Sequence, residues 1–452
     1  MRKNYITMLL VSALPYGVAS TASAQSTTPM QSAGQATDAG QYNLNSSTLP
    51  APGSNVQHQG AANYELSGTR ISGVNAGATN YILTTPVGSA GAYKTESGIY
   101  LYPSVFSGFG YNSNVGSSSS NVVGSSMLLF APQLVAEMKN KGDRYTALVS
   151  SNTTRYASSS QDNTSGSELK VAGDNYFSSR ARAGWSAGVL NASDPRQANI
   201  RTTVDKYRTT ALNGRLIYGA PEASGRLELD LGTQDKSYEN NRATTERLDL
   251  TLNSVAGRAY YRLGTRSLAL GEIRNTRSRY ASALAAASNN TERRYYAGLT
   301  WDATAATTGI VKVGHMTKDF DQSSVPGFSG PSWEATVRWM PLTYSVIDLQ
   351  TAKSTSDSTG VGGFEIRTSN DVFWNHKWTQ SLTSRVALGR LATDFSGAGR
   401  RDIAINYALT VDYALRRWLK VGVDLAGTDN TSNIPSAEYK RTVTMFTLNA
   451  SL

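Results

Sequence analysis

The chain has 452 residues, a formal net charge of +10 and no cysteine. A hydrophobic content of 39% and a mean hydropathy of -0.35 make it too polar for a bundle of membrane-spanning helices. Its 40 glycines and 24 tyrosines are too many for a typical α/β enzyme. The lack of cysteine excludes disulfide bonds, thiolate metal sites and a lipidated N-terminal cysteine.

The N-terminus has the pattern of a secretory signal peptide. Arg2 and Lys3 precede an apolar run over residues 6–19, and the sequence Ala-Ser-Ala at 22–24 offers a cleavage site. We therefore expect residues 1–24 to direct export. No later run approaches the roughly 18 apolar residues that a spanning helix needs, so an exported chain of this kind is either soluble or a β-barrel.

The segment 25–98 is poor in large apolar residues over its first half, which consists mainly of Ser, Thr, Gln, Ala, Gly and Pro. Such a composition cannot bury a core, and we expect most of the segment to be disordered in the periplasm. Residues 61–97 carry weak strand patterns that Gly and Pro interrupt, which favours a lead-in or a partial plug of the lumen.

From residue 99 to the C-terminus the chain is a series of alternating segments, and we expect this part to form the fold. The segments begin near residues 99, 122, 143, 163, 177, 204, 224, 243, 265, 291, 307, 331, 343, 362, 382, 400, 418 and 437. An even number of strands returns both ends of a barrel to the periplasm. About eighteen strands are predicted. Sixteen is the alternative, because the pattern over 163–202 fits one long strand or two.

The stretch DIAINYALTVDYALR, residues 402–416, shows the alternation best. Its odd positions are apolar or aromatic, and its even positions are small, polar or charged. At about 3.3 Å per residue the apolar positions cover roughly 40 Å, which a tilt near 40° projects onto about 30 Å, the thickness of a bilayer's hydrocarbon core. The pattern predicts a transmembrane strand with one face toward lipid and one toward water.

Connections of two lengths alternate along this part of the chain. Short ones are predicted at 139–143, 219–224, 263–266, 302–306, 340–342, 379–381 and 416–418. Longer polar loops lie between them, such as 281–290, 321–331 and 354–363. Alternation of turns and loops is typical of an antiparallel up-and-down outer-membrane barrel, an all-β fold with periplasmic turns and extracellular loops.

Four tryptophans lie next to predicted short turns. These are Trp301, Trp339, Trp378 and Trp418, and the first three fall on the apolar face of their segments. A soluble core would give tryptophan no preference for one end of the strands. The positions therefore predict an aromatic girdle at a membrane interface.

The last residues, RTVTMFTLNASL, alternate up to Leu452. Barrel proteins carry such a terminal strand, which the outer-membrane assembly machinery recognises and which usually ends in Phe. We expect the same partner here, although this strand ends in Leu.

The start of the alternating part resembles a known family. YPSVFSGFGYNSNV (102–115), followed by SSMLLFAPQLVAEMKNKGDRYTALVSSNTTRYASSSQDN (125–163), resembles the putative β-barrel porin 2 family of bacterial outer-membrane proteins. The resemblance covers residues 99–452. It implies a role in exopolysaccharide or capsule systems. The expected partners are outer-membrane lipid, periplasmic export components and the polysaccharide, which would be an anionic partner if it is acidic.

Catalysis is not expected from this sequence. A serine hydrolase needs an oriented histidine, and the only histidines are His58 in the N-terminal segment and His315 and His376 on predicted lipid-facing positions. Without paired histidines or cysteines we expect no metal site, and we expect no cofactor and no nucleic-acid partner.

The residues on the wet face are the candidates for a transport path. They include Arg180, Arg182, Arg226, Arg338, Arg367, Lys377, Glu334 and Asp371. Charges of both signs around a closed barrel would make a hydrated lumen, although each could instead pair across strands to stiffen the wall. The preferred function is a bacterial outer-membrane channel that exports an exopolysaccharide or capsular polysaccharide. The alternatives are a general or anion-preferring diffusion porin and a sealed structural or adhesive barrel.

Overall fold

The computed structural model describes residues 93–194, 202–220, 223–304, 307–357 and 363–451, with the backbone of 65–66 and 69–70. The predicted signal peptide, His58, Leu452 and most of the predicted N-terminal segment lie outside these residues. Among the residues described, no helix has the length and apolar character that a membrane-spanning helix requires.

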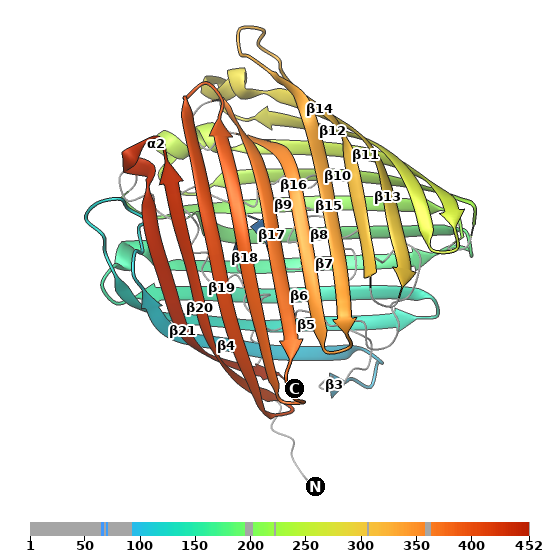
Figure 1. Cartoon of the computed structure of the whole chain (residues 1–452), viewed down its shortest axis with the longest axis horizontal. Coiled ribbons are helices and arrows are strands. Elements are labelled where there is room, and N and C mark those ends of the chain that lie inside the picture. The colour runs from blue at the N-terminus through green and yellow to red at the C-terminus, as the bar shows by residue number, and fades with distance from the viewer. Residues whose placement is uncertain are drawn as a thin grey trace.

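Eighteen long strands, β4 to β21, form one closed antiparallel barrel (Figure 1). The first nine are β4 (Tyr100–Asn112), β5 (Ser125–Asn140), β6 (Asp143–Tyr156), β7 (Thr164–Tyr176), β8 (Ala181–Asp194), β9 (Asp205–Tyr218), β10 (Gly225–Tyr238), β11 (Leu250–Gly264) and β12 (Ser267–Tyr280). The rest are β13 (Asn290–Thr304), β14 (Thr307–Phe320), β15 (Phe328–Leu342), β16 (Ser345–Asp357), β17 (Phe364–Lys377), β18 (Leu382–Phe395), β19 (Arg400–Arg416), β20 (Leu419–Ser432) and β21 (Tyr439–Ser451).

The barrel closes where the last strand meets the first. β21 pairs with β4 in a register that sets Phe446 opposite Phe109 and Ser451 opposite Ser104. Every other long strand pairs with its neighbours in the chain. The short strand β3 (Tyr93–Lys94) pairs with the start of β4, and β1 (Glu65–Leu66) pairs with β2 (Thr69–Arg70). Closure leaves no long strand with an unpaired edge, which a membrane requires of a sheet.

The two ends of the barrel differ in their connections. One end, here called the turn end, has turns of two to six residues, and the loop end has connections of four to twelve. All the helical pieces of the described residues lie at the loop end: η1 (Ser160–Asp162), α2 (Arg242–Thr245), η2 (Glu246–Leu248), η3 (Ala283–Ser288) and η4 (Pro435–Ala437). The shortest loop, 396–399, reverses the chain with Gly397 and Gly399 at φ +78 and +62, where a side chain would be strained.

The predicted fold is confirmed, with the eighteen strands that the sequence favours. The alternative of sixteen strands is wrong. The ambiguous stretch contains two strands, β7 and β8, separated by a turn at 177–180. Seventeen predicted starts fall within four residues of the observed ones. The exception is the strand predicted from 243, which begins at Leu250, because α2 and η2 take up residues 242–248 in the preceding loop.

The strands turn their apolar side chains outward. On β19 the exposed apolar residues are Ile405, Tyr407, Leu409, Val411, Tyr413 and Leu415, and the even-numbered positions between them are buried or half-buried. A buried face in a barrel of this kind is the inner face, so the outer surface is the apolar one. The strands of the near and far walls cross each other in Figure 1, as the tilt of barrel strands requires.

Glycines on the outer face make room for aromatic rings of the neighbouring strand. Trp301 lies opposite Gly309, and Tyr407 lies opposite Gly427. A Cβ at Gly309 would approach the Trp301 ring to 2.6 Å, so the ring lies flat against the backbone of β14. Such cross-strand pairs shield a glycine that would otherwise weaken the strand.

Candidate functional site

The inner face of the barrel carries most of the charged side chains that are buried. On β10, Arg226, Glu228 and Asp230 are buried, whereas the residues that alternate with them, such as Leu227 and Leu231, are exposed. The alternation follows from the pleat, which sends successive side chains to opposite faces. The same strand therefore presents a charged face to the interior and an apolar face to the outside.

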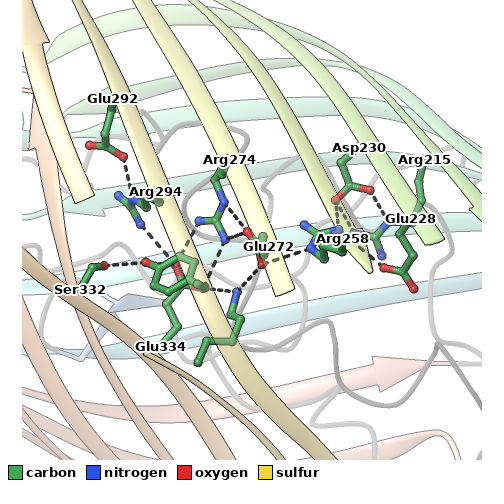
Figure 2. Close-up of polar contacts among 12 residues, drawn as sticks. Arg215, Glu228, Asp230, Arg258, Glu272, Arg274, Glu292, Arg294, Ser332 and Glu334 are labelled. Atoms are coloured by element: carbon green, nitrogen blue, oxygen red, sulfur yellow. Dashed lines mark hydrogen bonds and ion pairs between the residues drawn. The ribbon is translucent and has the colours of Figure 1, made fainter. Parts of the chain in front are cut away.

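Buried and half-buried charges on eight consecutive strands, β9 to β16, join into one ion-pair network. Figure 2 shows its central part, from Arg215 to Glu334. Its cations are Arg215, Arg226, Arg258, Arg274, Arg294, Lys312 and Lys318, and its anions are Glu228, Asp230, Glu272, Glu292, Glu334 and Asp357. Seven cations against six anions leave the network close to neutral.

The register of the sheet creates this network by placing opposite charges directly across from each other. Arg215 is paired with Asp230, and Nε of Arg215 lies 2.6 Å from Oδ1 of Asp230. Arg258 stands opposite Glu272, with Nε 3.2 Å from Oε2. Direct cross-strand pairs of opposite charge stabilise a sheet. A slip of one residue would turn each of these charges toward lipid.

Glu334 on β15 is the central anion. Arg274 and Arg294 stand directly opposite each other on β12 and β13, an arrangement that would repel if nothing lay between them. Oε1 of Glu334 accepts from Nη1 of Arg274 at 3.0 Å and from Nη1 of Arg294 at 3.3 Å, and Lys312 also pairs with this carboxylate. The hydroxyl of Tyr296 lies 3.3 Å from the same oxygen.

Several members of the network are shielded almost completely. Arg274 and Arg294 are each 1% exposed and Lys312 is 0% exposed. Buried charges are tolerated only when paired and hydrogen-bonded, and removal of one partner of a buried pair costs about 3–5 kcal/mol. The network therefore holds the inner wall in one register.

Four of the predicted lumen arginines are each paired with an acid on the inner face. Arg182 pairs with Asp174, and Nε of Arg226 lies 3.1 Å from Oε1 of Glu228. Nε of Arg338 lies 2.6 Å from Oδ1 of Asp348, and Nη2 of Arg367 lies 2.6 Å from Oε2 of Glu365. Pairing of this kind weakens the field that each arginine sends into the lumen.

The remaining predicted lumen residues lie in different surroundings. Glu334 belongs to the network, and Asp371 is buried on β17. Arg180 lies in the exposed turn before β8, and Lys377 is exposed at the last position of β17. Both are therefore at the turn end.

An apolar cluster faces the interior on other strands. It consists of Phe106, Val115, Met127, Leu129, Ala131, Tyr156, Phe373, Ala387, Ala408, Val443 and Met445. Most of these residues belong to β4, β5, β21 and the strands from β17 to β19. β21 is nine strands from β12 in a barrel of eighteen, so the cluster is centred opposite the network.

The four tryptophans of the predicted girdle all lie at the turn end. Trp339 is exposed on the outer face of β15, Trp301 is half-buried over Gly309, and Trp378 and Trp418 are exposed in turns. Trp378 stacks near His376, with ring centroids 4.2 Å apart, so this histidine belongs to an outward aromatic group.

The two histidines of the described residues lie on outward positions of their strands. His315 is exposed on β14 and lies 2.9 Å from the hydroxyl of Ser329. Over the described ranges no three residues among His, Asp and Glu come together as metal ligands would.

Most residues of the network are not among the candidates predicted from the sequence. Arg258, Arg274, Arg294 and Lys312 are missing from these candidates, although each occupies an inner position of its strand. The alternation within segments such as GEIRNTR and TERRYYAG is the signal that would have found them. Their partners follow only from the register, since Arg274 and Glu334 are 60 residues apart.

Several solved structures are similar to this chain. OpdK from Pseudomonas aeruginosa, solved with vanillate, is 11% identical, with 78% of this chain and 99% of that chain covered and a TM-score of 0.45. The copper transporter OprC is 9% identical, with coverages of 78% and 81% and a TM-score of 0.44. The FrpB iron transporter from Neisseria meningitidis is 10% identical, with a TM-score of 0.43. The match covers 73% of this chain and only 62% of FrpB.

Comparison with curated proteins finds no match. The family model described as "Putative beta-barrel porin 2" matches residues 91–452, which is the whole barrel and the short strand before it. Family and fold together point to the outer membrane of a bacterium and to a porin-like barrel. The chain belongs to the putative beta-barrel porin 2 family.

Proposed function

We propose that this barrel is a passive outer-membrane conduit for hydrophilic solute, and that its solute is an exopolysaccharide or capsular polysaccharide on its way out of the cell. The observation that carries the proposal is the inner wall from β9 to β16, where charged groups of both signs are paired across the strands. Inner-face pairs that stay partly exposed, such as Arg182 with Asp174 and Arg338 with Asp348, offer hydrogen-bonding groups to a polar chain. A charged wall also keeps a lipid acyl chain out.

The balance of charge favours a solute with many hydroxyl groups over a small anion. An anion-preferring porin needs a net positive lumen, which concentrates anions and repels cations. Here the network has one more cation than anions, and Arg182, Arg338 and Arg367 outside it are paired with carboxylates. The diffusion porin remains the second candidate, because a polar lumen of any kind would also admit small solutes.

The ends of the barrel suit the passage of a continuous chain. Connections at the loop end have only four to twelve residues, and the helical pieces within them are one or two turns long. In this proposal the driving force is polymer synthesis at the inner membrane, and the barrel lowers the cost of crossing by keeping hydroxyls hydrated. Periplasmic export components would meet the turn end, and the assembly machinery would recognise β21.

The first test is conductance of the purified full-length protein in planar bilayers. We expect an open channel with little preference for anions or cations. The chain has no cysteine, so a single introduced one can be labelled alone. Gln133→Cys on the inner face of β5, labelled with a bulky maleimide, should reduce the conductance, whereas Ser288→Cys in η3 should leave it unchanged when labelled.

The second test is made in cells. A strain that lacks the protein should lose surface polysaccharide and retain polymer in the periplasm, and the wild-type chain should restore export. A normal surface yield together with slower uptake of small solutes would favour the diffusion porin instead. A barrel that folds and never conducts would contradict both transport functions and favour the sealed structural barrel.

A further inference from the structure

A small hollow opens on the inner face of β7 to β10, beside the β9 edge of the ion-pair network. Its cavity volume is about 40 Å³. One ordered water needs about 10–15 Å³ on a comparable measure, so the hollow can take a few waters or one polar arm of a larger solute. The polar residues that line it include Lys170, Ser186, Thr209, Asn213 and Gln234.

The register explains why a hollow forms at this place. Lys170 stands opposite Gly188, Gly188 opposite Ala211, and Ala211 opposite Gln234, so these four residues form one row across four strands. Gly188 and Ala211 carry almost no side chain, and they form the floor. The longer side chains of Lys170 and Gln234 stand at its two sides.

Polar groups without partners surround this floor. Oγ1 of Thr209, Oδ1 of Asn213 and Nε2 of Gln234 have no hydrogen-bond partner among the described residues. All three side chains are more than nine-tenths buried. The amide nitrogen of Asn213 donates to Ser186 at 3.4 Å, which leaves its oxygen free to accept from another group. Unpartnered buried polar atoms cost stability, so a group that satisfies all three would be bound.

The partner that these atoms need has both donors and acceptors on neighbouring atoms. The oxygen of Asn213 must receive a hydrogen bond, the nitrogen of Gln234 must give one, and the hydroxyl of Thr209 can do either. Hydroxyl groups on adjacent carbons meet these demands, because each donates one bond and accepts others. A carboxylate or phosphate meets only part of them, since it accepts and does not donate.

The charge of the hollow also favours a neutral solute. Glu168 and Lys170 are two residues apart on β7 and both line it, so their charges oppose each other. Ala211 and Leu190 add an apolar part to the lining. A sugar ring combines hydroxyl edges with apolar C–H faces, and this lining has a counterpart for each.

We propose that the hollow over Gly188 and Ala211 is a binding subsite that takes the hydroxyl-bearing edge of one unit of a neutral saccharide. The inference rests on the proposed function in that a saccharide must reach the lumen. Binding itself is measured on the purified barrel and requires no transport. The subsite would hold a passing chain weakly, through one sugar at a time.

The test uses the full-length protein in a detergent without sugar headgroups and cellobiose as the probe. Saturation-transfer difference NMR should show saturable binding of cellobiose, and citrate at the same ionic strength should neither bind there nor compete. The double variant Thr209→Val with Gln234→Leu keeps the size of both side chains and removes two polar partners. It should bind cellobiose about tenfold more weakly, the effect of one to two lost hydrogen bonds.

The matched control is Thr410→Val. Thr410 is a buried threonine of the inner face of β19 whose hydroxyl also has no partner among the described residues, but it does not line the hollow. This variant should bind cellobiose as the wild type does. Ala211→Leu, which fills the floor, should abolish binding while the barrel keeps its heat-modifiable mobility on gels.

The inference is overturned if the wild type shows no saturable binding, if the double variant and Thr410→Val bind equally, or if citrate competes as well as a sugar. A barrel that conducts but binds no cellobiose contradicts the subsite alone. A barrel that binds cellobiose but never conducts contradicts the proposed transport and leaves the subsite standing.

Discussion

The ion-pair network and the apolar cluster occupy opposite parts of the same inner surface and hold it together in different ways. In the network, partners on neighbouring strands must meet at hydrogen-bond distance, as the 2.6 Å between Arg215 and Asp230 shows. In the cluster, side chains such as Phe106 and Met445 need only fill space. An ionic wall therefore specifies the register of the strands strongly. An apolar wall tolerates hydrophobic substitutions that keep the side-chain volume.

The two parts of the inner surface also affect which solutes the lumen can pass. An apolar patch alone would not support a hydrated solute, and an unpaired charged wall would select ions strongly. The barrel has a nearly neutral polar wall on one side and a compact apolar one on the other. This combination suits a solute with polar edges and apolar faces, and it provides a contrast that substitutions can test.

The largest effect is expected at the centre of the network. Glu334→Gln keeps the shape of the side chain but removes the charge shared by Arg274, Arg294 and Lys312. It should lower the free energy of unfolding by about 3–5 kcal/mol, because three buried cations lose an anion. Urea unfolding in lipid vesicles, followed by tryptophan fluorescence, measures the change.

The matched substitution in the apolar cluster is Met445→Leu. Methionine and leucine have similar volumes, so this change should cost less than about 1.5 kcal/mol. If Glu334→Gln and Met445→Leu lowered the free energy of unfolding equally, water would screen the network. The two parts of the inner surface would then be equally tolerant of substitution.

Substitutions on the outer face should cost the same free energy of unfolding behind the network as behind the apolar cluster. Leu409 on β19 and Ile273 on β12 are both exposed apolar residues near the middle of their strands, one behind the cluster and one behind the network. Arginine at either position would enter hydrocarbon and should cost about 2–4 kcal/mol. Leu415→Arg, on the same face of β19 but at the turn end, should cost about 0–1 kcal/mol. A clear difference between Leu409→Arg and Ile273→Arg would show that the two outer faces do not lie at the same depth.

Ion selectivity tests whether pairing is what keeps the lumen neutral. Asp348→Asn with Glu365→Gln removes the carboxylates beside Arg338 and Arg367. The reversal potential in a potassium chloride gradient should then move toward anion preference. Asp319→Asn removes the same kind of charge from the exposed pair with Arg293 and should leave the potential unchanged. A shift of equal size for Asp319→Asn would place the selecting charges outside the lumen.

The sequence predicts the barrel well, because alternation and turn spacing are local properties. It fails at 242–248, because most of these residues fall in the strand predicted from 243 but form α2 and η2 in the loop before β11. The inner surface is harder to predict. Alternation tells that Glu334 faces inward, but its contacts with Arg274 and Arg294 depend on the register of four strands. The hollow over Gly188 and Ala211 depends on register in the same way, since nothing in either segment alone marks it.

The smallest effect is expected at Arg293 on β13, whose neighbour Arg294 faces the opposite side of the strand. Arg294 is buried and pairs with Glu292, whereas Arg293 is exposed and pairs with Asp319 at 2.8 Å near the loop end. Arg293→Gln should change the free energy of unfolding by no more than about 1 kcal/mol, because solvent screens an exposed pair.

That small change should also shrink with added salt, since at 1 M the screening length falls to about 3 Å. Arg294→Gln, one residue away, should cost several times more and keep its cost in salt, because solvent does not reach the pair that it breaks. The two variants change the same side chain in the same way, so only the face of the strand differs. If both losses were equal and equally sensitive to salt, the inner pairs would be as hydrated as the outer ones, and the inner wall would be lined by water rather than held by ion pairs.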